Sequence, residues 1–129
     1  MDKLAPGLAA EIETIVTDED TAERLGSGSV PVFGTPALVG LMEGAAIRVL
    51  EGLLPPGTTS VGSRLDVRHL APTPVGMHVR ARAELLEVTG RRLVFHIKAW
   101  DERQQIGEAT HERFVVDRER FIARTMVKS

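Results

Sequence analysis

The sequence predicts an α+β fold in which an antiparallel sheet curls around one central helix. Three observations support this prediction. The stretch that begins at Thr35 is long and apolar nearly all round, as expected of a helix that other elements cover. One strand pattern precedes it, and the chain after it consists almost entirely of segments that alternate with the period of a strand. Wrapping such a sheet around the helix is the economical way to bury it.

The first strand is predicted over Ala9–Thr17, where residues alternate loosely between a more apolar and a more charged side. Residues 18–34 are polar and then rich in Gly, Ser and Pro, which indicates a long connection. We expect one helical turn in it, around Thr21–Leu25. Long connections in compact domains often line a site.

The central helix has clear start and stop signals. Thr35 is suited to cap it, Pro36 suits its first turn, and Pro55-Pro56-Gly57 is expected to stop it. Every residue from Pro36 to Ile47 except Glu43 is apolar or Gly. This helix is therefore expected to be wrapped by other elements.

Four strands are predicted after the helix. They cover Val61–His69, Met77–Val88, Leu93–Trp100 and Ile106–Val116, separated by turn-forming segments. In the first of them, one face is predicted to carry Val61, Ser63, Leu65, Val67 and His69. We expect the four strands to form an antiparallel meander. A strand, a buried helix and such a meander make up the hot-dog fold.

Composition excludes several classes of function. The 129 residues are expected to form a single domain, residues 1–129, with a sizeable core because 43% are hydrophobic. Cys is absent, which excludes disulfides and thiol nucleophiles and fits a cytoplasmic protein. The net charge of −2 and the few aromatic residues argue against nucleic acid as a partner. No leader or membrane-spanning run is recognised, and no glycine-rich loop has the context of a nucleotide site.

Glu43 is the residue that most needs an explanation. A carboxylate on the apolar centre of a wrapped helix loses water, so it is expected to be paired, protonated or functional. One alternative is a structural ion pair with Arg48, Arg68 or Arg113. Another is a helix rolled so that Glu43 faces solvent at a subunit edge.

Two further groups are candidates for chemistry. Thr35 is either a simple cap or a hydroxyl that acts beside the free N–H groups of the helix N-terminus. His69 ends an inward-facing strand row, where it is either a half-buried structural residue or a proton carrier. His78 and His96 fall on outer faces, and His111 is interpreted as a sheet residue. The histidines are too widely spaced for a metal motif, so no metal site is assigned.

Three stretches resemble, in order and spacing, the fluoroacetyl-CoA thioesterase-like family of hot-dog proteins. They are FGTPALVGLMEGAAIRVL, SVGSRLDVRHLAPTPVGMHVRARAELLEVTGRRL and IGEATHERFVV, and together they cover about residues 30–121. The family's Thr at the helix start, its Glu eight residues on and its His twenty-six beyond match Thr35, Glu43 and His69. Gly62 matches a Gly seven residues before the His, and Arg113 matches the Arg of the T-H-E-R segment.

The resemblance implies hydrolysis of an acyl-CoA thioester at a homodimer interface, with no cofactor beyond the CoA of the substrate. Glu43 would attack the thioester carbonyl or orient the group that does, His69 would activate water, and Thr35 would hydrogen-bond within this triad or take part in the attack. The Gly62 N–H would help stabilise the oxyanion. Arg113 would pair with Glu43, bind a CoA phosphate or lock the dimer.

The segment before Thr35 departs from the family pattern. Members specialised for fluoroacetyl-CoA carry bulky aromatic residues there as a lid, whereas this chain has Gly26 and Ser29 near those positions and retains only Phe33 as a substrate-binding candidate. The resemblance therefore implies a different acyl preference. Two other functions stay open from the sequence: a non-catalytic binder of acyl-CoA or a small acid, and a hot-dog enoyl-CoA hydratase or dehydratase.

Overall fold

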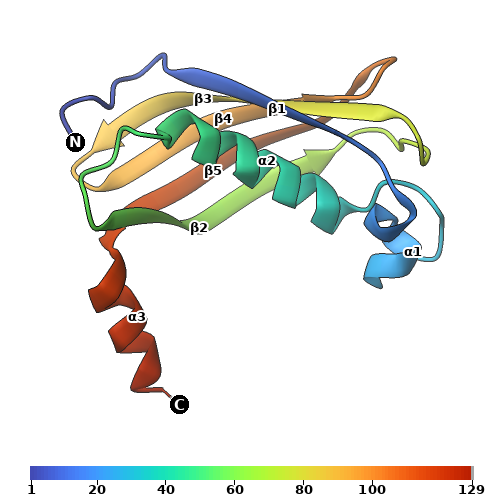
Figure 1. Ribbon diagram of the computed structural model, residues 1–129. Helices are drawn as coiled ribbons and strands as arrows, with labels where there is room; N and C mark the ends of the chain where they lie inside the picture. The colour runs from blue at the N-terminus through green and yellow to red at the C-terminus, as the bar shows by residue number, and fades with distance from the viewer. Residues whose placement is uncertain (129) are drawn as a thin grey trace.

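A computed structural model of the chain describes residues 1–128. One antiparallel sheet of five strands forms a layer, and a long helix lies along one of its faces (Figure 1). The strands are β1 (Ala9–Ile15), β2 (Thr58–His69), β3 (His78–Thr89), β4 (Arg92–Trp100) and β5 (Gln105–Asp117). The helices are α1 (Ala22–Leu25), α2 (Thr35–Leu50) and α3 (Arg118–Met126), with a short 3-10 turn at Asp18–Asp20.

The strand order corrects the predicted meander. The sheet runs β1-β3-β4-β5-β2, so only β3, β4 and β5 follow one another in space as they do in sequence. Strand β2 crosses to the far edge and pairs with β5, from Thr58 opposite Asp117 to His69 opposite Gly107. The segment between β2 and β3 contains two prolines and is too long for a tight hairpin, so it carries the chain across the sheet.

Helix α2 begins and ends differently from the prediction. Gly34, with extended backbone angles, is the N-cap, so Thr35 is the first helical residue and does not cap the helix. The helix stops at Leu50, before the prolines, because Gly52 adopts a left-handed φ of 73° that is strained for other residues. The Thr35 hydroxyl is consequently free for another partner.

The core lies between α2 and the sheet. The alternation predicted for β3 and β4 is confirmed, because Val79, Ala81, Ala83, Leu85, Leu93, Phe95, Ile97 and Ala99 are all buried against the helix side. Leu38, Met42, Ala45 and Ala46 of α2 are fully buried beneath them. Burial of this kind contributes about 25 cal/mol per Å² of apolar surface removed from water.

One face of α2 stays open, which corrects the expectation of a fully wrapped helix. Pro36, Gly40 and Ile47 are exposed along this face, and Glu43 is half-buried between them. We call these four residues the open stripe of α2. They recur at intervals of three or four residues, so they line up on one side of the helix. The sheet covers α2 from the other side only (Figure 1).

A β-bulge at Ser63 changes which residues of β2 face the helix. The pairing of β2 with β5 shifts between Gly62 and Arg64, so Ser63 is the extra residue. As a result Gly62, and not Ser63, shares the inner face with Leu65, Val67 and His69. The Ser63 hydroxyl instead donates to the Glu112 carboxylate at the outer surface, at 2.8 Å.

Helix α3 is an element that the sequence analysis did not predict. Asp117 caps it by accepting a hydrogen bond from the backbone of Arg120 at 3.1 Å. None of its residues is buried, and it projects past the β2 edge of the sheet (Figure 1). Within residues 1–128 no helix is both long and apolar enough to cross a membrane.

Candidate active site

Two polar groups gather on the helix side of the sheet, and the first joins Thr35 to His69. Thr35 Oγ1 lies 2.8 Å from His69 Nδ1, so the first residue of α2 is tied to the last residue of β2. Among residues 1–128, His69 Nε2 is the buried side-chain polar atom without a hydrogen-bond partner. Buried polar atoms are nearly always paired, so an unpaired ring nitrogen indicates a place for a ligand or a further polar group.

His69 is poised as a neutral ring. Burial lowers its pKa below the ordinary value of 6.5, and a smaller effect of the Ala71 backbone opposes this shift. Near pH 7 one ring nitrogen therefore carries a proton and the other accepts one. Thr35 contacts one of them, and the unpartnered Nε2 is available for the other half of a proton transfer.

The second polar group surrounds the Glu43 carboxylate. Arg113 NH1 donates to Glu43 Oε2 at 3.4 Å, Arg113 Nε donates to Ser60 Oγ at 2.9 Å, and Arg113 NH2 donates to the Ser60 carbonyl at 3.0 Å. The Arg113 side chain is 6% exposed and that of Glu43 39%. Of the three arginines considered as partners of Glu43, Arg113 is the one that pairs with it, and its other two roles, toward a CoA phosphate or the dimer, stay predictions. Glu43 itself is less buried than the sequence predicts.

His111 completes this group, although the sequence analysis did not include it among the site residues. Its Nδ1 lies 2.8 Å from the carbonyl of Arg64 and its Nε2 lies 3.2 Å from Arg113 NH1. Because a carbonyl only accepts, Nδ1 carries the proton and Nε2 accepts from Arg113. Burial lowers the pKa of His111, and the neighbouring positive charge of Arg113 also contributes. The ring thus helps to fix the guanidinium that holds Glu43.

Gly62 lies directly against this second group. A methyl carbon at Gly62 would sit 2.9 Å from Glu43 Oε2, 3.3 Å from the His111 ring and 3.4 Å from Arg113 NH1. The absence of a side chain there allows the carboxylate to approach the β2 backbone. Four of the predicted site residues therefore form two close pairs, Thr35 with His69 and Glu43 with Gly62.

The two groups do not meet within one chain. Thr35 and Glu43 are eight residues apart on α2, which corresponds to about 12 Å along the helix axis. Gly62 and His69 are separated by about 23 Å along β2. Phe33, the remaining candidate, is buried in the core at 2% exposure, so its part in substrate binding stays a prediction. Within residues 1–128 no cluster of three or more His, Asp or Glu side chains is arranged to hold a metal ion.

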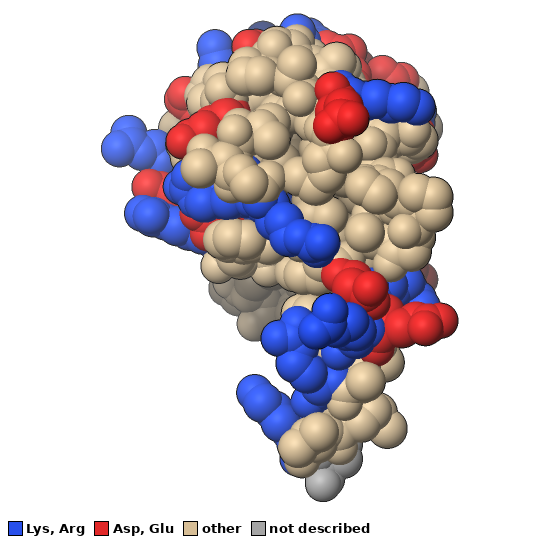
Figure 2. All heavy atoms as spheres, turned by 90° about the vertical axis from the view of Figure 1, so that its left-hand side faces the viewer, with Lys and Arg blue, Asp and Glu red and all other residues tan. Residues whose placement is uncertain are grey.

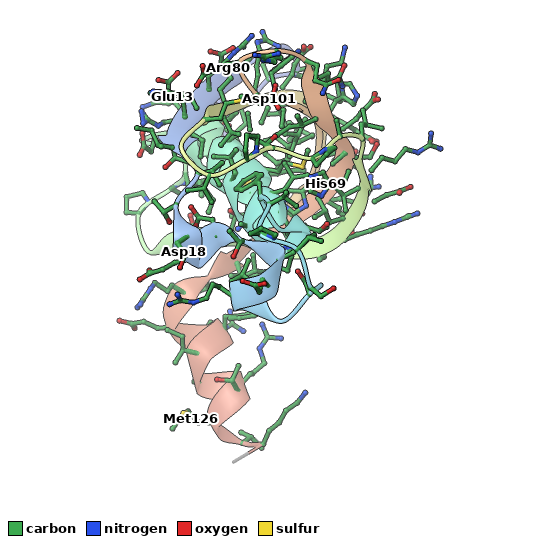
Figure 3. The ribbon with its side chains drawn as sticks, turned by 90° about the vertical axis from the view of Figure 1, so that its right-hand side faces the viewer. Glu13, Asp18, His69, Arg80, Asp101 and Met126 are labelled. Atoms are coloured by element: carbon green, nitrogen blue, oxygen red, sulfur yellow. The ribbon has the colours of Figure 1, made fainter. Side chains whose placement is uncertain are left out.

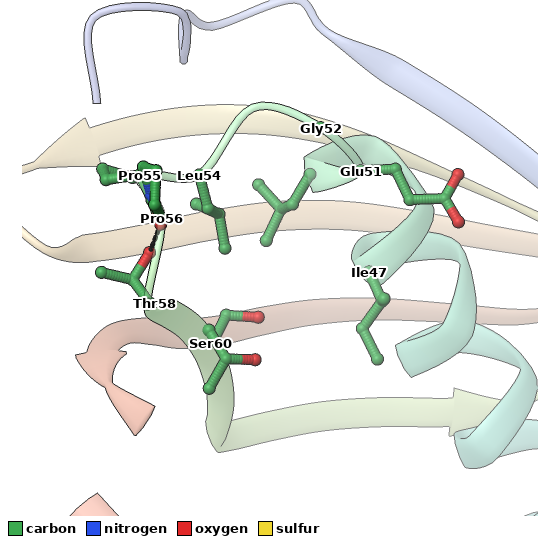
Figure 4. A pocket seen from close by; sticks show the side chains of 11 residues that line it. Ile47, Glu51, Gly52, Leu54, Pro55, Pro56, Thr58 and Ser60 are labelled. Atoms are coloured by element: carbon green, nitrogen blue, oxygen red, sulfur yellow. Dashed lines mark hydrogen bonds between the residues drawn. The ribbon is translucent and has the colours of Figure 1, made fainter. Parts of the chain in front are cut away.

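A depression of about 400 Å³ opens beside the second group, between the end of α2 and the start of β2 (Figure 4). Its walls are mainly apolar and include Ile47, Leu50, Leu54 and Pro55. Ser60, which holds Arg113, lies at its β2 side. Space for an apolar group therefore lies next to the residues that position Glu43.

Comparison with known proteins places this arrangement in a family. The family model described as fluoroacetyl-CoA-specific thioesterase matches residues 16–119. The chain belongs to this family. It is 44% identical over 98 residues to the fluoroacetyl-CoA thioesterase of Streptantibioticus cattleyicolor, a stretch that covers 76% of this chain and 70% of that protein.

Solved structures agree with the family. A structure of the fluoroacetyl-CoA thioesterase FlK superposes with a TM-score of 0.93 at 36% identity, covering 99% of both chains. A Thermus thermophilus protein described as a thioesterase superfamily member gives 0.89 at 31% identity, covering 98% of this chain and 93% of that one. These matches confirm the hot-dog fold and the assignment as an acyl-CoA thioesterase. The protein therefore hydrolyses an acyl-CoA thioester.

Proposed function

We propose that this thioesterase cleaves its acyl-CoA at a site shared by two copies of the chain. Thr35 and His69 of one copy act together with Glu43 and Gly62 of the second. The observation that carries the proposal is the separation of the two polar groups within one chain. Each group is held by its own contacts, but neither contains all of the residues proposed for the reaction. A homodimer with two such sites is the simplest assembly that unites them.

The geometry of α2 and β2 allows a single two-fold axis to do this. Thr35 lies against His69 and Glu43 lies against Gly62, so the helix and the strand run in opposite directions. An axis near Leu65, midway between Gly62 and His69, is therefore also near the midpoint between Thr35 and Glu43. Rotation about it carries each group onto the position facing the other. One operation thus completes both sites.

Two surfaces are available for this contact. Strand β2 is an edge of the sheet over 12 residues, and a long edge strand is a natural template for pairing with another chain. The open stripe of α2 is apolar apart from Glu43, as expected of a helix face that a second helix covers. The two surfaces adjoin each other, because Glu43 of the open stripe lies against Gly62 of β2.

The residues supply what thioester hydrolysis needs. Nδ1 of His69 contacts the Thr35 hydroxyl, and Nε2 is free to face the substrate. The ring can therefore transfer a proton between the hydroxyl and the substrate. Glu43 Oε2 is held by Arg113, which leaves Oε1 to face the carbonyl carbon or an attacking water. The N-terminus of α2 and the Gly62 N–H favour the negative charge that develops on the carbonyl oxygen. Water adds an OH to the acyl carbon, and the thiolate of CoA leaves with a proton.

The acyl group is proposed to lie between the apolar depression of one copy and residues 26–33 of the other, because the helices run antiparallel in the dimer. Gly26 and Ser29 leave this space wider than aromatic residues would. The preferred acyl group is therefore larger than a two-carbon unit. A cytoplasmic location and the absence of a cofactor remain predictions.

Thiol release from a panel of acyl-CoA substrates tests the activity, and mixing two inactive variants tests the shared site. Glu43→Gln and His69→Ala are each expected to lose thiol release by orders of magnitude while keeping the fold. In a refolded equimolar mixture, half of the dimers carry one intact site, so about a quarter of the wild-type activity is expected to return.

A site contained in one chain gives no recovery in that mixture. Unchanged rates in both single variants contradict the role of these residues altogether. Saturable binding with the thioester intact after long incubation indicates a binding protein instead of an enzyme with this substrate.

A further inference from the structure

Helix α3 presents an apolar and a basic face that its own chain leaves open. Phe121, Ile122, Thr125 and Met126 fall on one side of the helix, and Ile122 and Met126 are 42% and 65% exposed. Arg120 and Arg124 fall on the adjoining side, Lys128 follows the helix, and Figure 2 shows Lys and Arg side chains gathered over this helix. An amphipathic helix without a covering element is a surface for a partner.

The start of α3 is fixed beside the start of β2. The backbone N–H of Arg118 donates to the carbonyl of Gly57 at 3.0 Å, one residue before β2 begins. From there the helix runs away from the sheet beyond the β2 edge (Figure 1). It therefore projects into the space where the proposed second copy lies.

The two-fold axis near Leu65 defines which part of the second copy α3 meets. Thr58 and Thr73 lie at about equal distances along the chain on either side of Leu65. The two-fold axis therefore brings Thr58 of one copy opposite the loop around Thr73 of the other. That loop follows His69, and it is tied to the segment before α2 because the Phe33 N–H donates to the Thr73 carbonyl at 2.8 Å. Helix α3 is thus directed at the end of the second copy that holds Thr35 and His69.

The surface at this end complements α3 in both polarity and charge. Four exposed apolar side chains lie in the connections there: Leu25, Val30, Leu70 and Val75. Acidic residues lie in the connection before α2, at Asp18, Glu19, Asp20 and Glu23; Asp18 is paired with Arg24 at 2.6 Å, and Glu19 and Glu23 are exposed. Figure 3 views the molecule from this end, with Asp18 to the left and His69 to the right.

We propose that α3 is an arm that packs on the second copy, with its apolar face on the patch around Leu70 and its basic face toward the acidic turn at Asp18–Asp20. This inference rests on the proposed shared site, because it uses the same two-fold axis. The arm of one copy then forms a wall of the site that contains the other copy's Thr35 and His69. Each active site is closed by a helix from the neighbouring chain.

The natural absence of Cys makes a cross-linking test specific. Ile122→Cys in α3 and Leu70→Cys beside His69 are prepared as separate proteins, refolded as a mixture and treated with a short bismaleimide. A covalent dimer is expected in the mixture and not with either variant alone. The matched control mixes Ile122→Cys with Thr14→Cys, an exposed position on β1 at the opposite edge of the sheet, and is expected to give no covalent dimer.

Sedimentation and thiol release on the same mixtures separate the two proposals. A dimeric, active mixture without a cross-link overturns the arm while leaving the shared site intact. A monomeric, active protein overturns the shared site and the arm together. As a second measurement, Ile122→Asp is expected to weaken dimer formation at least tenfold with the fold retained, whereas Ala123→Asp, off the apolar face, leaves it within twofold. Equal effects of the two variants contradict the arm.

Discussion

Replacement of Gly62 by Ala tests whether Glu43 depends on close approach to the β2 backbone. The new methyl carbon would sit 2.9 Å from Glu43 Oε2, whereas an ordinary contact begins at 3.4 Å. The carboxylate, which is the flexible partner, must therefore move by about 0.5 Å, since Arg113 and His111 are held by several bonds. A displacement of 1 Å at a reacting group costs about a hundredfold in rate, so Gly62→Ala is expected to lower kcat about tenfold.

Steady-state thiol release measures this effect, and urea unfolding measures the accompanying overpacking, which is expected to cost about 1–3 kcal/mol. The matched control is Ser63→Ala, the neighbouring residue whose side chain points to the outer surface, and it is expected to keep kcat within twofold. If Gly62→Ala retains wild-type kcat, the close approach of Gly62 and Glu43 has no part in catalysis. If both variants lose activity equally, the effect belongs to the strand and not to the carboxylate.

Four further predictions follow from the polar groups and the missing aromatic lid. Because burial lowers the pKa of His69, kcat/KM is expected to rise with pH with a midpoint below 6.5, and a midpoint at or above 6.5 contradicts the buried neutral ring. His111 has a lowered pKa as well, so its contribution to stability is complete above pH 6.5 and is lost as the pH falls toward that lowered value; urea midpoints at pH 5 and 7.5 check the sign. His111→Phe removes the donor to the Arg64 carbonyl and one acceptor of Arg113 NH1, and it is expected to cost about 1–3 kcal/mol in urea unfolding, against less than about 1 kcal/mol for the surface control His96→Phe. Ser29→Phe is expected to shift the acyl-CoA panel toward shorter acyl groups, and an unchanged profile shows that this segment does not border the acyl group.

The regular alternation of the sequence was sufficient to predict the strands and the central helix. The apolar residues that alternate along β3 and β4 are buried, because a period of two leaves only one apolar face. The position of β2 was not predictable in this way, since alternation gives no information on which neighbour a strand selects. The bulge at Ser63 was also hidden, because it inserts one residue without changing the composition of the strand.

The site was partly accessible to sequence reasoning. Its residues were recognised by their resemblance to the family pattern, but that pattern does not show that Thr35 meets His69 while Glu43 meets Arg113. The alternation of Ala109, His111, Arg113 and Val115 along β5 was a usable signal for His111, because it places the ring on the same buried face as the guanidinium. Glu43 was expected to be buried because its neighbours are apolar, and it is half-exposed because those neighbours form an open stripe.

The placement of β2 at the edge also bears on how the protein reaches its active state. Strands β3, β4 and β5 join by local hairpins, whereas β2 pairs with residues from 38 to 59 positions away in the chain. Contacts between distant segments form late because the chain must first close a long loop. Strand β2 carries both Gly62 and His69, so helical and sheet structure is expected to return early in refolding while thiol release returns only with the last strand. The return of thiol release during refolding therefore indicates that β2 has joined the sheet and the fold is complete.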